Sequence, residues 1–385
     1  MEWKEVDICQ LCDSVSETYK GNASEVVLIN TSDVLDGKCL NHEYVPNKKL
    51  KGQFKKTFRK GDILYSEIRP ANKRFCFVDF EPKDYIASTK LMVLRAHEDV
   101  DPQYLYQILR SNDTLTQLQM LAESRSGTFP QITYSELSNI MVSLPSQKAQ
   151  KNIVSILSSL DRKIELNNKI NADLEEMAQA IFKNWFVDFE PFKDGKFVDS
   201  ELGMIPEGWK VGTLDEIFSL KYGKNLSTSM ILEKGDYPVY GANGIIGYYN
   251  EFNCDKYSVL VTSRGNGSGD VSRTHHPKSF ITNNSFVVEP LEHYKYIKLP
   301  FINGLFNIID FKSYCSGSAQ PQLTNKAMRN ICIISPPREL VIKYCEIFET
   351  LFSHIECVID ENSRLSLLRD TLLPRLMSDE IEVPE

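Results

Sequence analysis

The residues best suited to binding chemistry in this sequence lie in two short glycine-rich segments, 241–244 and 263–269. Their asparagine, serine and arginine side chains carry donors and acceptors of defined geometry, which is what base edges and phosphates require. The glycines between them let the backbone approach a ligand closely. Plain hairpin turns use the same residue types, so both interpretations stay open. In the second half of the chain, the candidate contact residues are Asn243, Ser263, Arg264, Asn266 and Gln322.

A basic segment in the first half is the second candidate for nucleic-acid contact. Residues 48–74 hold ten lysines and arginines against two acidic residues, Asp62 and Glu67. The whole chain carries a net charge of −8, which argues against bulk coating of nucleic acid but permits a local basic face. A solvated loop can have the same composition. The candidate contact residues of this half are Arg69, Lys73, Arg74 and Gln131.

Motifs for catalysis are missing from the sequence. It contains no G-x-G-x-x-G, no G-x-x-x-x-G-K-[ST], no H-E-x-x-H and no G-x-S-x-G. We therefore predict no catalytic residue and a chain that is not an enzyme. A magnesium-dependent nuclease needs little more than an Asp and a Glu-x-Lys, which Asp79, Glu81 and Lys83 match loosely, although Pro82 would interrupt the strand. A stand-alone nuclease of this kind remains an alternative.

Metal-binding spacing is weak as well. Cys9 and Cys12 form the one C-x-x-C, and a structural zinc site needs about four ligands. His275 and His276 are adjacent, and adjacent strand residues point to opposite faces. We expect no bound metal. Nine cysteines, an odd number, suit a reducing compartment. Because the sequence shows neither an apolar run of bilayer length nor a signal peptide, we expect a cytoplasmic protein.

The elements that would position the candidate residues occur twice. The segment 129–133 recurs at 320–324, an offset of 191 residues, and the two copies continue without a gap for more than forty positions. Earlier segments also correspond, with different offsets: Trp3 resembles Trp209, 61–69 resembles 256–264, and 86–93 resembles 281–288. Apolar runs bounded by turn residues predict strands at 26–29, 63–65, 91–94, 259–261 and 286–288, and a short helix is predicted at 101–110.

Each copy ends in a long helical segment. Neither Pro nor Gly interrupts residues 146–185, where apolar residues alternate spacings of four and three, and the second copy repeats the seam. A helix of this length cannot bury its stripe alone, so we expect the two helices to form an antiparallel coiled coil. Asn171 and Asn362 occupy equivalent seam positions, where a polar residue fixes register or lies in an exposed turn. The predicted helix-pairing residues are Leu160, Ile164, Asn171, Leu174, Leu351, Ile355, Asn362 and Leu365.

These features together resemble the specificity subunit of type I restriction–modification systems. The resemblance covers nearly the whole chain and is carried by the repeated Pro-Gln-[Ile/Leu]-Thr segment, by 206–209 and by 240–248. It implies double-stranded DNA as a ligand, with each variable domain recognising one half of a split target. It also implies two methyltransferase subunits as partners, which bring S-adenosylmethionine, and restriction (motor) subunits that join for cleavage. No cofactor is expected on this chain itself.

We therefore predict an α/β (α+β) fold with two sheet-rich target-recognition domains, two long helices and an internal pseudo-twofold repeat. The predicted function is sequence-specific DNA recognition, and a coiled-coil protein scaffold is a further alternative. The predicted boundaries are a first recognition domain at 1–145, a first helix at 146–185, a linker at 186–206, a second recognition domain at 207–335, a second helix at 336–376 and an acidic tail at 377–385.

Overall fold

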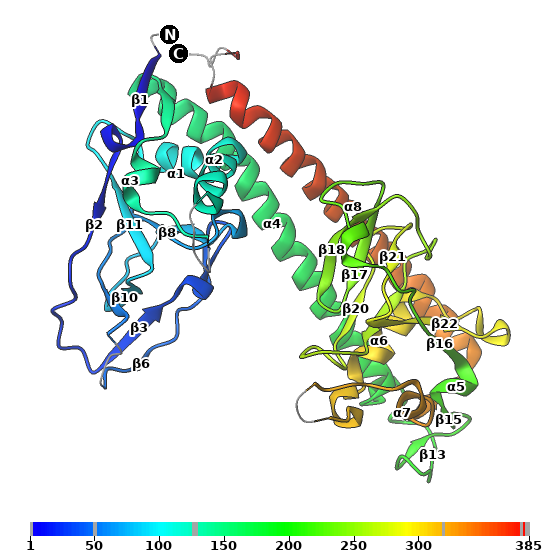
Figure 1. The fold of residues 1–385 in the computed structure, drawn as a ribbon. Coiled ribbons are helices and arrows are strands. Elements are labelled where there is room, and N and C mark those ends of the chain that lie inside the picture. Colours follow the sequence, from blue (N-terminus) through cyan, green and yellow to red (C-terminus); the bar gives the residue numbers. More distant parts are fainter. Residues whose placement is uncertain (1–2, 49–51, 125–129, 318–319, 378–379, 382–385) are drawn as a thin grey trace. The chain divides into compact units, whose positions relative to one another are not determined.

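A computed structural model describes residues 3–48, 52–124, 130–317, 320–377 and 380–381. The chain forms two compact units, one built from residues 1–164 together with 363–385, the other from 165–362. We call them unit 1 and unit 2. Two long helices, α4 (Gln147–Phe186) and α8 (Arg338–Met377), belong to both units, because the boundary between the units falls within each of them (Figure 1).

The long helices begin one and two residues later than predicted. The segment expected to be a linker, 186–206, is structured: it holds the last residue of α4, the 3-10 turn η4 (Glu190–Phe192) and a hairpin of β13 (Phe197–Val198) with β14 (Ile205–Pro206). Phe189 and Phe192 pack edge-on against Trp209, with ring centroids 5.2 and 5.4 Å apart. Aromatic packing therefore makes this segment part of the core of unit 2 rather than a linker.

The two helices pair in antiparallel fashion through the predicted seam. In unit 2, Asn167 Nδ2 donates to Asn362 Oδ1 at 2.9 Å, and further along α4 the hydroxyl of Tyr344 donates to the carbonyl of Ala178 at 3.5 Å. Residue numbers therefore rise along α4 as they fall along α8, so the two helices run antiparallel. The predicted pairing residues in unit 2 are Asn171, Leu174, Leu351, Ile355 and Asn362, and those in unit 1 are Leu160, Ile164 and Leu365; all are buried or half-buried.

The described residues of the first domain form two four-stranded sheets and three α-helices. One sheet has the order β2-β11-β8-β9, built from Cys12–Val15, Leu91–Ala96, Ile63–Ser66 and Phe75–Phe77. The other has the order β6-β3-β10-β7, built from Val45–Pro46, Glu25–Ile29, Tyr85–Ser88 and Phe54–Lys56. Smaller elements are β1 (Lys4–Asp7) paired with β12 (Met141–Leu144), the hairpin β4 (Val34–Leu35) and β5 (Lys38–Cys39), and the helices α1 (Pro102–Arg110), α2 (Asn112–Glu123) and α3 (Tyr134–Ser138).

The second domain repeats this plan. Its main sheet has the order β16-β22-β19-β20, built from Phe218–Tyr222, Ser285–Pro290, Val259–Thr262 and Val271–Arg273. Its second sheet has the order β18-β17-β21, built from Gly244–Tyr249, Tyr237–Gly241 and Phe280–Ile281. The remaining elements are β15 (Lys210–Thr213) paired with β23 (Cys332–Ser335), and the helices α5 (Leu214–Ile217), α6 (Leu299–Ile308) and α7 (Asn325–Arg329). All the strands predicted from apolar runs, and the short helix α1, are confirmed.

The repeated Pro-Gln-[Ile/Leu]-Thr segment has a structural explanation. Thr133 and Thr324 are the N-cap residues of α3 and α7. A threonine at this position satisfies backbone N–H groups that the first helical turn leaves free, and Thr324 Oγ1 accepts from the N–H of Ala327 at 3.2 Å. The preceding residues, Ile132 and Leu323, are fully buried. The motif therefore fixes the start of a helix and anchors it in the core.

Each long helix contributes to two cores. The core of unit 1 includes Ile153 and Leu157 of α4 with Leu373 and Leu376 of α8. The core of unit 2 includes Phe182 and Phe186 of α4 together with, from α8, Tyr344, Phe348 and Phe352. The helices are thus integral to the packing of the domains. Among the helices that the structure describes, none is both long enough and apolar enough to cross a bilayer.

Candidate nucleic-acid interface

A junction between two backbone segments occurs at the same place in both domains. In the first, Ile68 forms a bridge with Gln131, the N–H of Arg69 donates to Pro130 O at 3.1 Å, and the N–H of Ile132 donates to Glu67 O at 2.8 Å. The end of β8 is therefore held against the segment that leads into α3. This contact brings the backbone of Arg69 close to that of Gln131, although the two are 62 positions apart in the sequence.

The second domain has the same junction with different side chains. Arg264 forms a bridge with Gln322, the N–H of Gly265 donates to Pro321 O at 3.3 Å, and the N–H of Leu323 donates to Ser263 O at 2.9 Å. Arg264 and Gln322 are thus neighbours. The residue that bridges the repeated glutamine is thus an arginine in the second domain and Ile68 in the first, where Arg69 is the next residue along the chain.

The hydrogen bonds correct one detail of the repeat. The sequence comparison aligned Arg69 with Arg264, but the backbone pairing makes Arg264 equivalent to Ile68, and Arg69 equivalent to Gly265. A shift of one residue on an extended segment turns a side chain to the other face. Alternating apolar residues matched nearly as well in either register, so the sequence did not resolve the shift.

The loop after β8 holds two exposed cations on a constrained backbone. Arg69 and Lys73 flank the 3-10 turn η3 (Pro70–Asn72), and both adopt left-handed backbone conformations, with φ of 46° and 51°. Such values are uncommon for residues other than glycine and persist only where surrounding contacts impose them. The N–H of Ala71 donates to Gln119 Oε1 of α2 at 3.1 Å, which supplies one such contact. The loop therefore presents two positive side chains from a fixed base.

Arg74, predicted to contact DNA, has a different role in this structure. Its side chain is half-buried, and Nη1 donates to the carbonyls of Ser32 at 3.0 Å and Val34 at 3.4 Å. The guanidinium thus braces the β4–β5 hairpin against the loop. In the rest of the basic segment, the exposed lysines and arginines that the structure describes are Lys48, Lys55, Arg59 and Lys60. Lys56 is half-buried and donates to Leu91 O at 2.8 Å, and burial lowers the pKa of its amine. Lys49 and Lys51 lie outside the described residues.

The glycine-rich loop of the second domain is held at several points. Thr262 Oγ1 donates to Ala242 O at 2.8 Å, which ties the end of β19 to the turn between β17 and β18. Ser268 Oγ donates to Pro321 O at 2.6 Å, which ties the loop to the segment before α7. Asn243, Arg264 and Asn266 are exposed on this framework. The three side chains can therefore reach a ligand from a loop that is already ordered.

Ser263 is a wrong choice as a contact residue. It is fully buried, and its Oγ donates to the carbonyl of Asn283 at 3.4 Å. Gln131 and Gln322 are half-buried at their junctions. Of the serine- and glycine-rich segments that precede these two glutamines, residues 125–129 and 318–319 lie outside the described part of the chain.

The residues of the alternative nuclease do not form a strand site. Asp79, Glu81 and Lys83 lie in the loop between β9 and β10, where the N–H of Lys83 donates to Glu81 O at 2.9 Å. Within the described part of the chain, no group of three or more His, Cys, Asp or Glu side chains is arranged to hold a metal ion.

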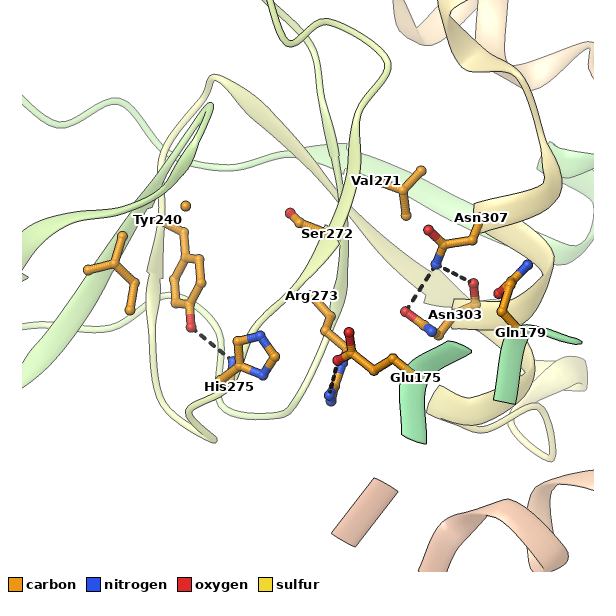
Figure 2. Close-up of a pocket in the computed structure, with 11 residues that line it drawn as sticks. Glu175, Gln179, Tyr240, Val271, Ser272, Arg273, His275, Asn303 and Asn307 are labelled. Carbon is orange, nitrogen blue, oxygen red and sulfur yellow. Dashed lines mark hydrogen bonds and ion pairs between the residues drawn. The ribbon is translucent and has the colours of Figure 1, made fainter. Parts of the chain in front are cut away.

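Sequence reasoning missed a set of buried charges at the long helices. Arg273 of β20 is 6% exposed and pairs with carboxylates of both α4 and α8. Beside it, a cavity of about 600 Å³ is lined by Glu175, Gln179, Ser272, Asn303 and Asn307, among others (Figure 2). Glu356 had appeared in the sequence only as one matched position of the repeat. No sequence signal links it to Arg273, because the two are 83 positions apart.

Fold and site together define a class of protein: a duplicated α+β chain in which each copy presents an ordered polar loop and contributes one long helix to an antiparallel pair. The chain belongs to the type I restriction–modification DNA specificity family, whose family model, "Type I restriction modification DNA specificity domain", matches residues 2–176 and 206–365.

Named relatives agree with this assignment. The HindI specificity subunit of Haemophilus influenzae is 32% identical, with 99% of this chain and all of the relative aligned. The MjaIX specificity subunit of Methanocaldococcus jannaschii is 27% identical over 90% of this chain and 85% of the relative. The crystal structure of the S subunit of a type I restriction–modification system from M. genitalium has the same fold, with a TM-score of 0.53, 21% identity and coverage of 98% and 96% of the two chains.

Proposed function

We propose that this chain is the DNA-specificity subunit of a type I restriction–modification complex, and that each of its domains reads one half of a bipartite DNA target. The observation that carries the proposal is the repeated junction, Ile68 with Gln131 and Arg264 with Gln322. Each junction fixes a polar or basic loop at the same place in its domain. Two loops at equivalent positions that carry different side chains suit a target whose two halves differ in sequence.

The chemistry of the loops suits base and phosphate contact. Arg264, Asn243 and Asn266 are exposed, and arginine and asparagine are the side chains that bond guanine and adenine in bidentate fashion. Arg69 and Lys73 add positive charge in the first domain, where phosphate contact would position the duplex. We assign no catalytic step to the chain, and we assign S-adenosylmethionine to its methyltransferase partners.

Two methyltransferase subunits are the proposed partners, together with restriction subunits for cleavage. Exposed apolar side chains recur on the long helices at the repeat offset of 191 residues: Ile156 with Ile347, and Met177 with Leu368. Exposed apolar positions mark interaction surfaces, and an internal repeat offers two similar surfaces to two copies of one partner. Unit 1 contains Ile156 and Leu368, and unit 2 contains Met177 and Ile347.

The test is selection of DNA from a random duplex pool by the chain co-expressed with its methyltransferase subunit, followed by sequencing. The expected result is a split motif with a fixed gap, and replacement of residues 1–145 by those of a relative should change one half of it. Recovery of no motif, with the partner present, would overturn the proposal. Equilibrium dialysis of S-adenosylmethionine against the chain without its partner should show no binding.

A further inference from the structure

Unit 2 contains an ion network of three side chains, two of them buried, that joins the recognition domain to both long helices. Arg273 lies on β20 of the domain, and its guanidinium Nη2 donates to Glu175 Oε1 of α4 at 2.9 Å. Its Nη1 donates to Glu356 of α8, whose side chain is 10% exposed. The guanidinium also lies over the ring of Phe352, 5.1 Å from the centroid. One side chain of the domain thus contacts both helices at once. Figure 2 shows its contact with Glu175.

Unit 1 contains a second three-way ion pair with the opposite charge at its centre. Asp161 of α4 accepts from Arg110 Nη1 of α1 at 2.8 Å and from Arg369 Nη1 of α8 at 2.9 Å. Arg110 is the last residue of α1 in the recognition domain. The pair therefore joins the same three elements: the domain, α4 and α8. We call the Arg273 and Asp161 groups the two brackets.

The brackets are not copies of each other. At the repeat offset, Asp161 corresponds to Phe352 and Arg369 corresponds to Ala178. Two different sets of residues, at different levels of the repeat, connect the same kinds of element. A feature reached by two chemical routes points to a shared requirement, which is that each domain be tied to both helices.

Buried ion pairs contribute little net stability, because desolvation offsets most of the attraction, but they can select one geometry among several. The Arg273 bracket requires that β20, α4 and α8 be in place together. The cavity of about 600 Å³ beside it shows that tight side-chain packing does not fill this side of the junction. On this side of the junction the charges add a directional constraint to the apolar packing between the second domain and the helices.

We propose that the brackets are positioning residues that fix the orientation of each recognition domain on the helix pair, and thereby set the number of base pairs that the complex accepts between the two half-sites. This inference rests on the proposed function. In dimeric DNA-binding proteins, the spacing between half-sites follows the geometry of the protein. The continuous helices α4 and α8 link the two brackets, so a domain that can tilt would accept gaps of more than one length.

The experiment uses the complex with the methyltransferase subunit and duplexes carrying the selected motif, with the gap shortened or lengthened by one and two base pairs. The test variant is Arg273→Met with Glu356→Leu, which removes both buried charges and keeps apolar volume; Glu175 is partly exposed and stays solvated. The wild type should prefer its own gap by about tenfold or more, and the variant by less than about threefold, a loss of roughly 0.7 kcal/mol of discrimination or more. Base preference within each half-site should not change.

The matched control is Lys256→Met with Glu289→Leu, which removes an ion pair of 2.6 Å that lies wholly within the second domain. It should leave the gap preference unchanged. Asp161→Leu with Arg110→Met tests the other bracket, because Arg369 keeps Asp370 as a partner at 2.9 Å, and it replaces the first variant if that variant does not fold. A gap preference that stays sharp in the folded bracket variants would overturn the inference alone. A wild type that selects no split motif would instead overturn the proposed function.

Discussion

Asn362 of α8 donates from Nδ2 to Asn168 Oδ1 of α4 at 2.8 Å, while its own Oδ1 accepts from Asn167 at 2.9 Å. An amide in the helix seam is thus bonded in both directions across the pair. Asn362→Leu should lower the free energy of unfolding by about 1–3 kcal/mol, because it leaves the buried amide of Asn167 with fewer partners. Asn167→Leu with Asn362→Leu should recover much of that loss, as measured by urea unfolding. Additive losses in the double variant would contradict this account.

Arg264 and Ser263 are adjacent but should behave differently in DNA binding. Arg264→Ala removes an exposed guanidinium, so the binding free energy should weaken by about 1–3 kcal/mol. The preference for one base should also relax at a single position of the motif. Ser263→Ala alters a buried hydroxyl and should leave the selected motif unchanged. Both are measured by selection and titration of the complex. A motif that changes with Ser263→Ala would show that its burial does not hold in the bound state.

Lys73 is expected to contribute charge rather than base preference. Lys73→Ala should weaken binding to all sequences alike, and the slope of log K against log salt should fall by about one unit. The control is Lys221→Ala, which removes an exposed cation that lies 3.8 Å from Glu289 on the second domain. A slope that stays the same in Lys73→Ala would place this lysine away from the phosphates.

Gly304 of α6 has no room for a side chain. A Cβ at this position would lie 2.2 Å from the ring of Phe182 on α4. Gly304→Ala should therefore destabilise unit 2 by about 1–3 kcal/mol through overpacking. Gly52→Ala is the control, because nothing lies within 4 Å of a Cβ there. Thermal unfolding of the two variants should separate them, and equal melting temperatures would refute the close contact.

Cysteine reactivity should follow the local environment. Burial raises the pKa of Cys12 to about 12, so this thiol stays protonated at pH 8 and should resist alkylation. A hydrogen bond from the Cys76 thiol lowers the pKa of Cys39, which raises its thiolate fraction at neutral pH. Iodoacetamide labelling followed by mass spectrometry at pH 6 to 9 should find Cys39 reactive at lower pH than Cys12. Cys76→Ala should shift the Cys39 profile to higher pH; an unchanged profile would exclude the thiol pair as its cause.

The proposed partner surfaces can be tested one at a time. Ile347→Asp places a charge on an exposed apolar position of α8, and Ile156→Asp does the same at the equivalent position of α4. Each should reduce the number of bound methyltransferase subunits from two to one, as measured by light scattering of the purified complex. Ser353→Asp, at another exposed position of α8, is the control. Retention of both subunits by both variants would place the docking surface elsewhere.

The helices and the repeat were predictable because their signals are local and periodic. The seam from Ile153 to Ile181 alternates buried and exposed residues over one continuous helix, and the Thr133 and Thr324 caps are read from three or four neighbouring residues. Sustained periodicity of this kind depends little on the rest of the fold.

The site was only partly predictable, because its features depend on contacts between distant segments. Arg74 and Ser263 have residue types suited to DNA, yet the guanidinium of Arg74 bonds the β4–β5 hairpin and Ser263 is buried. The register that equates Arg264 with Ile68 depends on hydrogen bonds to residues near 322 and 131. The brackets join residues separated by 51 to 208 positions, and no sequence pattern of one chain pairs a lone arginine with a lone carboxylate at such distances.

Because the two units share both long helices, the units can complete their folding in an order that differs from the order of translation. Unit 2 is one uninterrupted stretch, 165–362, whereas the core of unit 1 draws Leu373 and Leu376 from beyond that stretch. Domains generally fold as units during synthesis on the ribosome. A nascent chain that has emerged as far as residue 362 therefore holds all of unit 2 but still lacks two core leucines of unit 1. The recognition domain that is translated first is the one completed last.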